Sequence, residues 1–287
     1  MPGAVAVVTD SAASLPPAIA AKWGIRVVPL QVIVDGEARD EGADISSDEV
    51  LAALTAGRDV GTSQPSVIAF ERTFREAADA GATHVVAVLI SSRMSGTANG
   101  ARTAAANVDI PVTVVDTRTL AMATGFAAMA AAAVARDGGD VEAVAAEAAR
   151  VAASSRCIFT VDTLDFLKRG GRVSPAIAAV GKVLGVRPVL ELVDGEVALA
   201  DRVRSTQRAR AAVMARAEQA LAGLERPASA VMVLGDAEYG DDAARELEVR
   251  HPELAMLVRT PVSAVLAVHT GPGTLAAVVA DIPSHVR

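Results

Sequence analysis

The chain has 287 residues, of which 52% are hydrophobic and 2% aromatic, and its formal net charge is −7. This length favours two structural units over one, and the apolar content is enough for large buried cores. The negative charge argues against a protein that binds nucleic acid by neutralising phosphates, and the scarcity of aromatic rings argues against a site that stacks bases or sugars.

Short apolar runs alternate with helical segments in the first half of the chain. We expect a strand over Val5–Val8 and then a helix that begins at Pro16-Pro17, where the missing proline N–H does no harm. A second strand is expected over Val27–Val34, and Asp35-Gly36 after it predicts a tight turn. Another helix is expected to open at Ser46–Glu49, which has the spacing of a capping box.

Two continuous apolar runs, Val85–Ile90 and Val112–Val115, each follow a helical segment. Continuous runs suit parallel strands that are covered on both faces. We therefore predict an α/β lobe with a parallel sheet over residues 1–155. Glycine and proline interrupt this pattern near residues 61–77, so that segment is expected to contact or cross into the second lobe.

The apolar stretch Ala121–Val134 has only 14 residues, which is too short to span a bilayer, and it predicts a buried helix. The first residues, Met1–Val8, contain neither a basic segment nor a cleavage site of small residues, so no signal peptide is expected. These features predict a cytoplasmic protein with no stable membrane insertion.

The second half of the chain has a different pattern. Val186–Val193 and Glu196–Val203 flank Asp194-Gly195, which predicts an antiparallel hairpin. We therefore predict an α+β lobe over residues 156–287. A helix, a strand, a helix and a strand are expected to follow the hairpin, over Thr206–Leu224, Val231–Leu234, Asp241–Arg250 and Leu254–Val258.

Three segments rich in hydroxyl groups and glycine stand out. They combine neutral hydrogen-bond donors, a histidine and free backbone N–H groups, without a cluster of carboxylates or a metal-ligand spacing. Such residues are suited to hold an anion and poorly suited to break bonds, so we expect neither a metal nor a cofactor. The segments are Thr62–Ser66, Ser91–Thr97 and His269–Gly273.

The segment Ser91–Thr97 follows a predicted strand, and ligands of open parallel sheets lie beyond the carboxyl ends of the strands. A helix opens at Ser95-Gly96-Thr97, and its first unpaired N–H groups favour an anion. Glycine at position 96 permits a close approach to a ligand. The alternative is that Ser91, Ser92 or Ser95 only caps this helix.

The other two segments also have plain structural alternatives. Thr62 and Ser63 are hydroxyl donors, but the loop that holds them also leads to a helix over Val67–Ala80 that Ser66 would cap. His269 is expected to end a helix, with Gly271 as its stop signal, and a lone histidine is commonly structural.

Cys157 and Asp10 are expected to have no chemical role. Cys157 is the only cysteine and lies in an apolar run, so it excludes an internal disulfide and indicates a buried, inert thiol. Asp10 ends the first strand without a second aspartate nearby, which favours a turn or cap residue.

Basic residues gather in two places on this acidic chain. They indicate either ordinary solvated faces or a docking surface for an acidic or phosphate-bearing partner. The two groups are Lys168, Arg169 and Arg172, and Arg202 and Arg204.

The chain resembles the DegV family nearly from end to end. The resemblance implies a two-lobed α/β protein that holds a long-chain fatty acid between its lobes. It also implies a non-catalytic carrier that presents the carboxylate to a separate ATP-dependent fatty acid kinase, which forms an acyl phosphate. The motifs that carry the resemblance are Val7–Ser11 with Leu15-Pro16, Val27–Leu30 with Asp35-Gly36, Thr62–Ser66, Ile90–Thr97, Arg169–Ser174 and His269–Gly273.

By this resemblance Thr62, Ser95 and His269 would hold the carboxylate, with Ser63 and Gly96 beside them. Arg93 departs from the family pattern, which usually has glycine there, and this puts the mouth of the pocket in doubt. Two alternatives stay open: a serine-dependent lipid hydrolase or acyltransferase that uses Ser95 or Ser92 with His269, and a regulatory lipid-binding protein.

Overall fold

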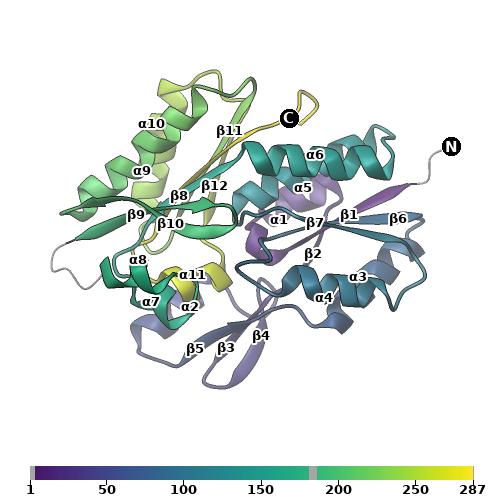
Figure 1. Cartoon of the computed structure of the whole chain (residues 1–287), viewed down its shortest axis with the longest axis horizontal. Helices are drawn as coiled ribbons and strands as arrows, with labels where there is room; N and C mark the ends of the chain where they lie inside the picture. The colour runs from purple at the N-terminus through teal and green to yellow at the C-terminus, as the bar shows by residue number, and fades with distance from the viewer. Residues whose placement is uncertain (1–3, 181–185, 287) are drawn as a thin grey trace.

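The computed structural model describes residues 4–180 and 186–286, so Met1–Gly3, the first part of the stretch in which no signal peptide is expected, lie outside the described residues. Its strands form a four-stranded, a six-stranded and a three-stranded sheet. The two larger sheets occupy opposite ends of the long axis, and the small sheet lies beneath their junction (Figure 1). The α/β prediction is confirmed.

The first sheet is parallel, as its continuous apolar runs predict. Helices α3 (Val67–Asp79) and α4 (Thr97–Ala105) pack on one face, and α5 (Met122–Arg136) and α6 (Val141–Ser154) cover the other. Its strands, in spatial order, are β2 (Arg26–Val28), β1 (Val5–Asp10), β6 (His84–Leu89) and β7 (Val112–Asp116).

The expectation of one strand over Val27–Val34 is wrong. The run is divided between β2 of the first sheet and β3 (Gln31–Val34) of the small sheet. Pro29 has no N–H to donate to a ladder, and the Leu30 N–H donates to Ser11 Oγ at 2.8 Å instead. The small sheet is completed by β4 (Glu37–Asp40) and β5 (Val60–Ser63), and the capping box at Ser46 is present at the start of α2 (Ser47–Thr55).

The second sheet is mixed, with β11 and β12 parallel and the other neighbours antiparallel. The predicted hairpin is confirmed: Asp194 and Gly195 have φ of 50° and 85° between β9 and β10. Helices α9 (Thr206–Leu221) and α10 (Ala237–Arg250) cover one face. The strands, in spatial order, are β10 (Glu196–Val203), β9 (Arg187–Val193), β8 (Arg156–Thr160), β13 (Leu275–Asp281), β11 (Pro227–Val233) and β12 (Met256–Pro261).

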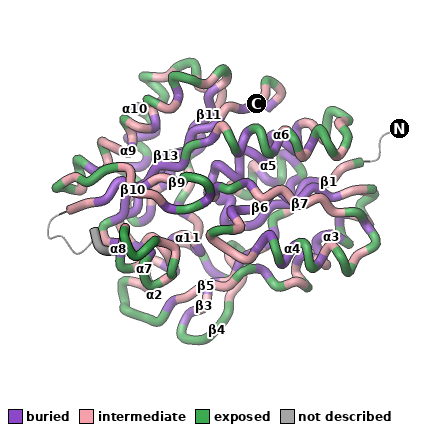
Figure 2. The backbone as a smooth tube through the Cα atoms, in the orientation of Figure 1, coloured by how far each residue is buried: buried purple, intermediate pink, exposed green. Residues whose placement is uncertain are grey.

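Helix α5 joins the two large sheets. Its residues 122–133 are all buried, which confirms the prediction of a buried helix over this alanine-rich stretch. It packs on β1 and β6 of the first sheet and on β13 of the second, and the buried residues form a continuous core across the junction (Figure 2). No helix in the described ranges 4–180 and 186–286 combines the length and apolarity needed to cross a bilayer.

The small sheet and α2 lie against the end of the chain. Helix α2 packs on α11 (Ala264–Thr270), where Ser47 Oγ donates to the Val262 carbonyl at 2.7 Å. The Val265 N–H donates to Glu41 Oε1 at 2.9 Å. Contact between the halves thus also involves residues before the segment 61–77, and α3, which begins in that segment and ends at Asp79, packs on the first sheet. The lobe boundary between residues 155 and 156 stays a prediction.

Candidate functional site

A cavity lies where the three sheets meet. It has a volume of about 150 Å³. This volume is below the ~300–1,000 Å³ of typical small-molecule sites, so the cavity is narrow and suits a slender ligand. Apolar side chains from strands of the second sheet and from the segments that follow strands of the first sheet form much of the wall, among them Ala12, Leu30, Ile90, Leu120, Phe159 and Met232.

Thr62 and His269 meet at this cavity although 207 residues separate them. Thr62 lies on β5, paired with Val32 of β3, and His269 lies in the last turn of α11. Thr62 Oγ1 is 2.8 Å from His269 Nε2, while His269 Nδ1 is buried and has no hydrogen-bond partner among the described residues.

His269 is neutral at physiological pH. Burial, and secondly the nearby Arg172 guanidinium, lowers the pKa of His269 to about 4. A neutral imidazole that carries its proton on Nε2 donates to Thr62 Oγ1, and the Thr62 hydroxyl hydrogen is then available to a ligand. In this tautomer the pair offers a hydrogen-bond donor without a positive charge.

Glycines allow the close packing around this pair. A Cβ at Gly170 would overlap with His269 Nδ1, and a Cβ at Gly96 would overlap with the Gln64 amide oxygen. Gln64 and Gly96 both line the cavity. Gln64 belongs to the sequence motif around Thr62, but the sequence pattern does not distinguish it from its neighbours as a site residue.

Ser95 and Gly96 reach the cavity from residues 91–96, which we call the head-group loop. This loop connects β6 to α4, whose predicted start after Ser95-Gly96 is confirmed. Gly96 is the residue before the helix and offers no side-chain cap, whereas Ser95 Oγ lies 2.8 Å from Thr97 Oγ1. Ser95 Oγ also accepts from the Thr97 N–H at 3.3 Å, so part of its role is local.

The structure brings all five candidate carboxylate-binding residues to one cavity: Thr62, Ser63, Ser95, Gly96 and His269. Ser63 is already engaged, because its hydroxyl donates to Gln31 Oε1 at 3.2 Å and lies 3.3 Å from the Gln64 carbonyl.

The five candidate docking residues divide into two kinds. Lys168 and Arg169 are exposed on α7 (Asp165–Arg169), and Arg202 and Arg204 are exposed at the end of β10. Arg172 instead lines the cavity, where its Nε donates to the Met94 carbonyl at 3.2 Å and its Nη1 to the Gly170 carbonyl. A cation thus lies beside the neutral donors. The sequence pattern did not distinguish Arg172 from the other basic residues of the run Lys168–Arg172.

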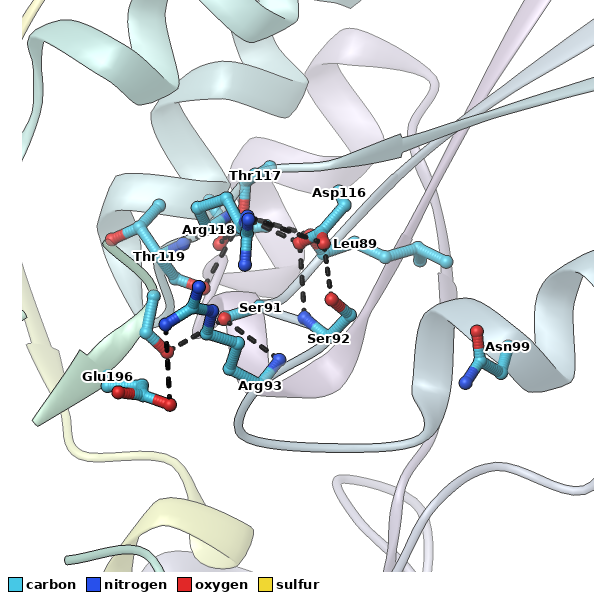
Figure 3. Close-up of polar contacts among 12 residues, drawn as sticks. Leu89, Ser91, Ser92, Arg93, Asn99, Asp116, Thr117, Arg118, Thr119 and Glu196 are labelled. Atoms are coloured by element: carbon cyan, nitrogen blue, oxygen red, sulfur yellow. Dashed lines mark hydrogen bonds and ion pairs between the residues drawn. The ribbon is translucent and has the colours of Figure 1, made fainter. Parts of the chain in front are cut away.

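Ser92 and Arg93 turn away from the cavity wall. Ser92 Oγ donates to Asp116 Oδ2 at 2.5 Å, and the Arg93 guanidinium lies 3.4 Å from Glu196 Oε1 (Figure 3). Neither residue is among those that line the cavity, so Arg93 does not obstruct it. The hydrogen bond that His269 makes among the described residues is to Thr62, and not to Ser92 or Ser95.

The two residues predicted to lack chemistry are buried. Asp10 accepts from the Ala12 N–H at 3.0 Å and caps the short helix η1 (Ser11–Ala13), as expected of a cap residue. Burial raises the pKa of Asp10 to about 7 and the pKa of the Cys157 thiol to about 12. Cys157 is buried, which confirms the prediction of a buried thiol, and a thiol with so high a pKa is protonated and unreactive.

Comparisons with known proteins agree with this architecture. Residues 4–281 match the family described as "Uncharacterised protein, DegV family". A DegV domain-containing protein of Streptomyces coelicolor is 40% identical over 280 residues, 96% of this chain and 98% of that protein. A solved structure described as "Fatty Acid Binding of a DegV family Protein from Thermus thermophilus" superposes with a TM-score of 0.90 at 33% identity, over 98% of this chain and 100% of that one. The structure of DegV of Bacillus subtilis, described as a fatty acid binding protein, superposes with a TM-score of 0.89 at 26% identity, over 97% of this chain and 99% of that one.

Proposed function

The chain belongs to the DegV family, and from that premise we propose that it binds a long-chain fatty acid in the cavity between its sheets. The bound acid would present its carboxylate to a separate ATP-dependent kinase in the cytoplasm. The observation that carries the proposal is the apolar cavity whose polar residues include Thr62, Ser95 and His269.

The apolar wall supplies the affinity for the acyl chain. Burial of an alkyl chain contributes about 0.8 kcal/mol per methylene. A chain of about 14 methylenes thus gives on the order of 11 kcal/mol before the costs of association and ordering. The polar residues need only offset the desolvation of the carboxylate.

The uncharged donors suit a carboxylate that must still react. In the kinase step a carboxylate oxygen attacks the γ-phosphorus of ATP, the bond from that phosphorus to the β,γ-bridging oxygen breaks, and ADP leaves. Thr62 and Ser95 stabilise the anion by hydrogen bonds, and His269 stays neutral since its pKa is about 4. We propose that the exposed cations at Lys168, Arg169, Arg202 and Arg204, together with Arg172 at the cavity, receive the kinase and its phosphates.

A carrier without catalysis of its own fits the contacts better than a hydrolase does. A serine hydrolase needs an acid behind its histidine. His269 Nδ1 has no hydrogen-bond partner within residues 4–180 and 186–286, and Ser92 is bound to Asp116.

Native mass spectrometry tests the proposal. Delipidated protein incubated with hexadecanoate should gain the mass of one fatty acid, and addition of an ATP-dependent fatty acid kinase should then yield acyl phosphate. A protein that stays at its delipidated mass with hexadecanoate and with octadecenoate would contradict the proposal. Normal lipid binding without acyl phosphate would instead favour a regulatory lipid-binding protein.

A further inference from the structure

The head-group loop is anchored residue by residue to its own sheet. The Ile90 N–H, just before the loop, donates to Asp10 Oδ2 at 2.9 Å, and the Ser91 N–H donates to the Thr119 carbonyl at 2.8 Å. The Ser92 N–H donates to Asp116 Oδ1 at 3.1 Å. These bonds fix the beginning of the loop relative to β1 and β7.

A second set of contacts comes from the β9–β10 hairpin of the other sheet. Ser91 is fully buried, and its hydroxyl donates to the Gly195 carbonyl at 2.8 Å across 104 residues of sequence. The same Ser91 Oγ accepts the Arg93 N–H at 3.2 Å, and Arg93 pairs with Glu196 next to Gly195 (Figure 3). One hydroxyl therefore links the loop to the hairpin turn and holds the loop's own backbone.

The hairpin turn fits this contact closely. Gly195 has a φ of 85°, which glycine adopts without strain, and a Cβ there would lie 2.5 Å from Ser91 Oγ. A side chain at position 195 would thus displace either the Ser91 hydroxyl or the turn. The hairpin contacts the loop at Ser91, four residues before Ser95, which reaches the cavity.

We propose that Ser91 and Gly195 are positioning residues for the fatty acid carboxylate: the hairpin turn of the second sheet holds the head-group loop so that Ser95 and Gly96 face Thr62 and His269. This inference rests on the proposed function. Neither Ser91 nor Gly195 lines the cavity, so both act through the loop.

Paired ligands separate this role from a general effect on the fold. Hexadecanoate and hexadecan-1-ol have the same chain length, and only the acid uses the full set of carboxylate donors. In the Ser91→Ala variant the dissociation constant of hexadecanoate should rise about tenfold, the size expected when one buried hydrogen bond is lost. That of hexadecan-1-ol should change less than about twofold. A purely structural role would weaken both ligands equally.

Two control variants match the changes. Ser229→Ala removes a fully buried hydroxyl that donates to the Val278 carbonyl at 2.9 Å within the second sheet. This variant should leave the ratio of the affinities for hexadecanoate and hexadecan-1-ol, the acid-to-alcohol ratio, unchanged. Gly36→Ala adds a methyl group in a hairpin turn with the same φ of 85°, but nothing lies within 4 Å of its Cβ. Gly195→Ala should lower the preference for the acid, whereas Gly36→Ala should not, and this pair suffices even if Ser91→Ala does not fold.

The outcomes are distinct. If Ser91→Ala has the same ratio of affinities for the acid and the alcohol as the wild type, the positioning role alone is overturned. If Ser91→Ala does not fold, the same result in Gly195→Ala overturns it. A wild-type protein that binds neither ligand would overturn the proposed function as well.

Discussion

Replacement of Thr62 by valine removes one hydroxyl with almost no change of shape. Thr62 lies in the middle of a strand ladder, paired with Val32, where a β-branched side chain is well accepted. The lost Oγ1 lies 2.8 Å from His269 Nε2. Since His269 Nδ1 has no partner either, the variant leaves the imidazole without a described hydrogen bond.

The expected size follows from these contacts. A buried polar group left without its partner costs about 1–3 kcal/mol. The same hydroxyl is proposed to donate to the ligand, so the hexadecanoate dissociation constant should rise by about 5- to 150-fold. Thr62→Ser keeps the hydroxyl and should stay within about threefold of the wild type.

Isothermal titration calorimetry of the delipidated protein measures this change directly. Thr160→Val is the matched control, because Thr160 is a buried strand residue whose hydroxyl donates to the Pro188 carbonyl at 2.7 Å and does not line the cavity. A Thr62→Val protein that melts at a lower temperature but binds hexadecanoate as the wild type does would refute the reasoning.

Three further predictions concern the same cavity. The pKa of His269 falls from 6.5 to about 4 on folding, so as the pH is lowered the unfolded chain takes up a proton before the folded protein does. The contribution of neutral His269 to the free energy of unfolding is therefore complete above pH 6.5, and the free energy of unfolding falls by roughly 3 kcal/mol as the pH is lowered to 4. The difference in unfolding free energy between the wild type and His269→Gln should follow that curve, and a difference independent of pH would contradict it. Gly170→Ala should weaken hexadecanoate binding about tenfold by displacing His269, whereas Gly223→Ala, with open space at its Cβ, should not; equal affinities would count against it. Met232→Trp should shift the preference from octadecanoate toward dodecanoate, since Met232 is buried and lines the cavity, and an unchanged ratio would refute this.

Local features of the chain were predictable from its sequence. The Asp194-Gly195 turn, the Ser46 capping box and the buried alanine-rich helix each follow from residues adjacent in sequence. The single strand over Val27–Val34 was predicted wrongly because the run is almost entirely apolar and the interruption at Pro29 was not given weight. At Pro29 the chain leaves the first sheet and enters the small one.

The geometry of the site was not predictable from pattern alone. Thr62 and His269 are 207 residues apart, and only a family resemblance suggested that they meet. In the sequence, Arg172 resembles the other members of its basic run. In the structure, it follows a turn at Gly171, whose φ is 69°, and its side chain lines the cavity. The contact of Ser91 with Gly195 left no local signal, because an Asp-Gly pair predicts a turn and not what the turn touches.

A crystal structure of the delipidated protein soaked with hexadecanoate tests the central claim most directly. We predict density for the acyl chain along the apolar wall beside Phe159 and Met232, with the carboxylate within about 3.2 Å of Thr62 Oγ1 and Ser95 Oγ. A chain bound outside this cavity, or a carboxylate at the end away from His269, would contradict the account.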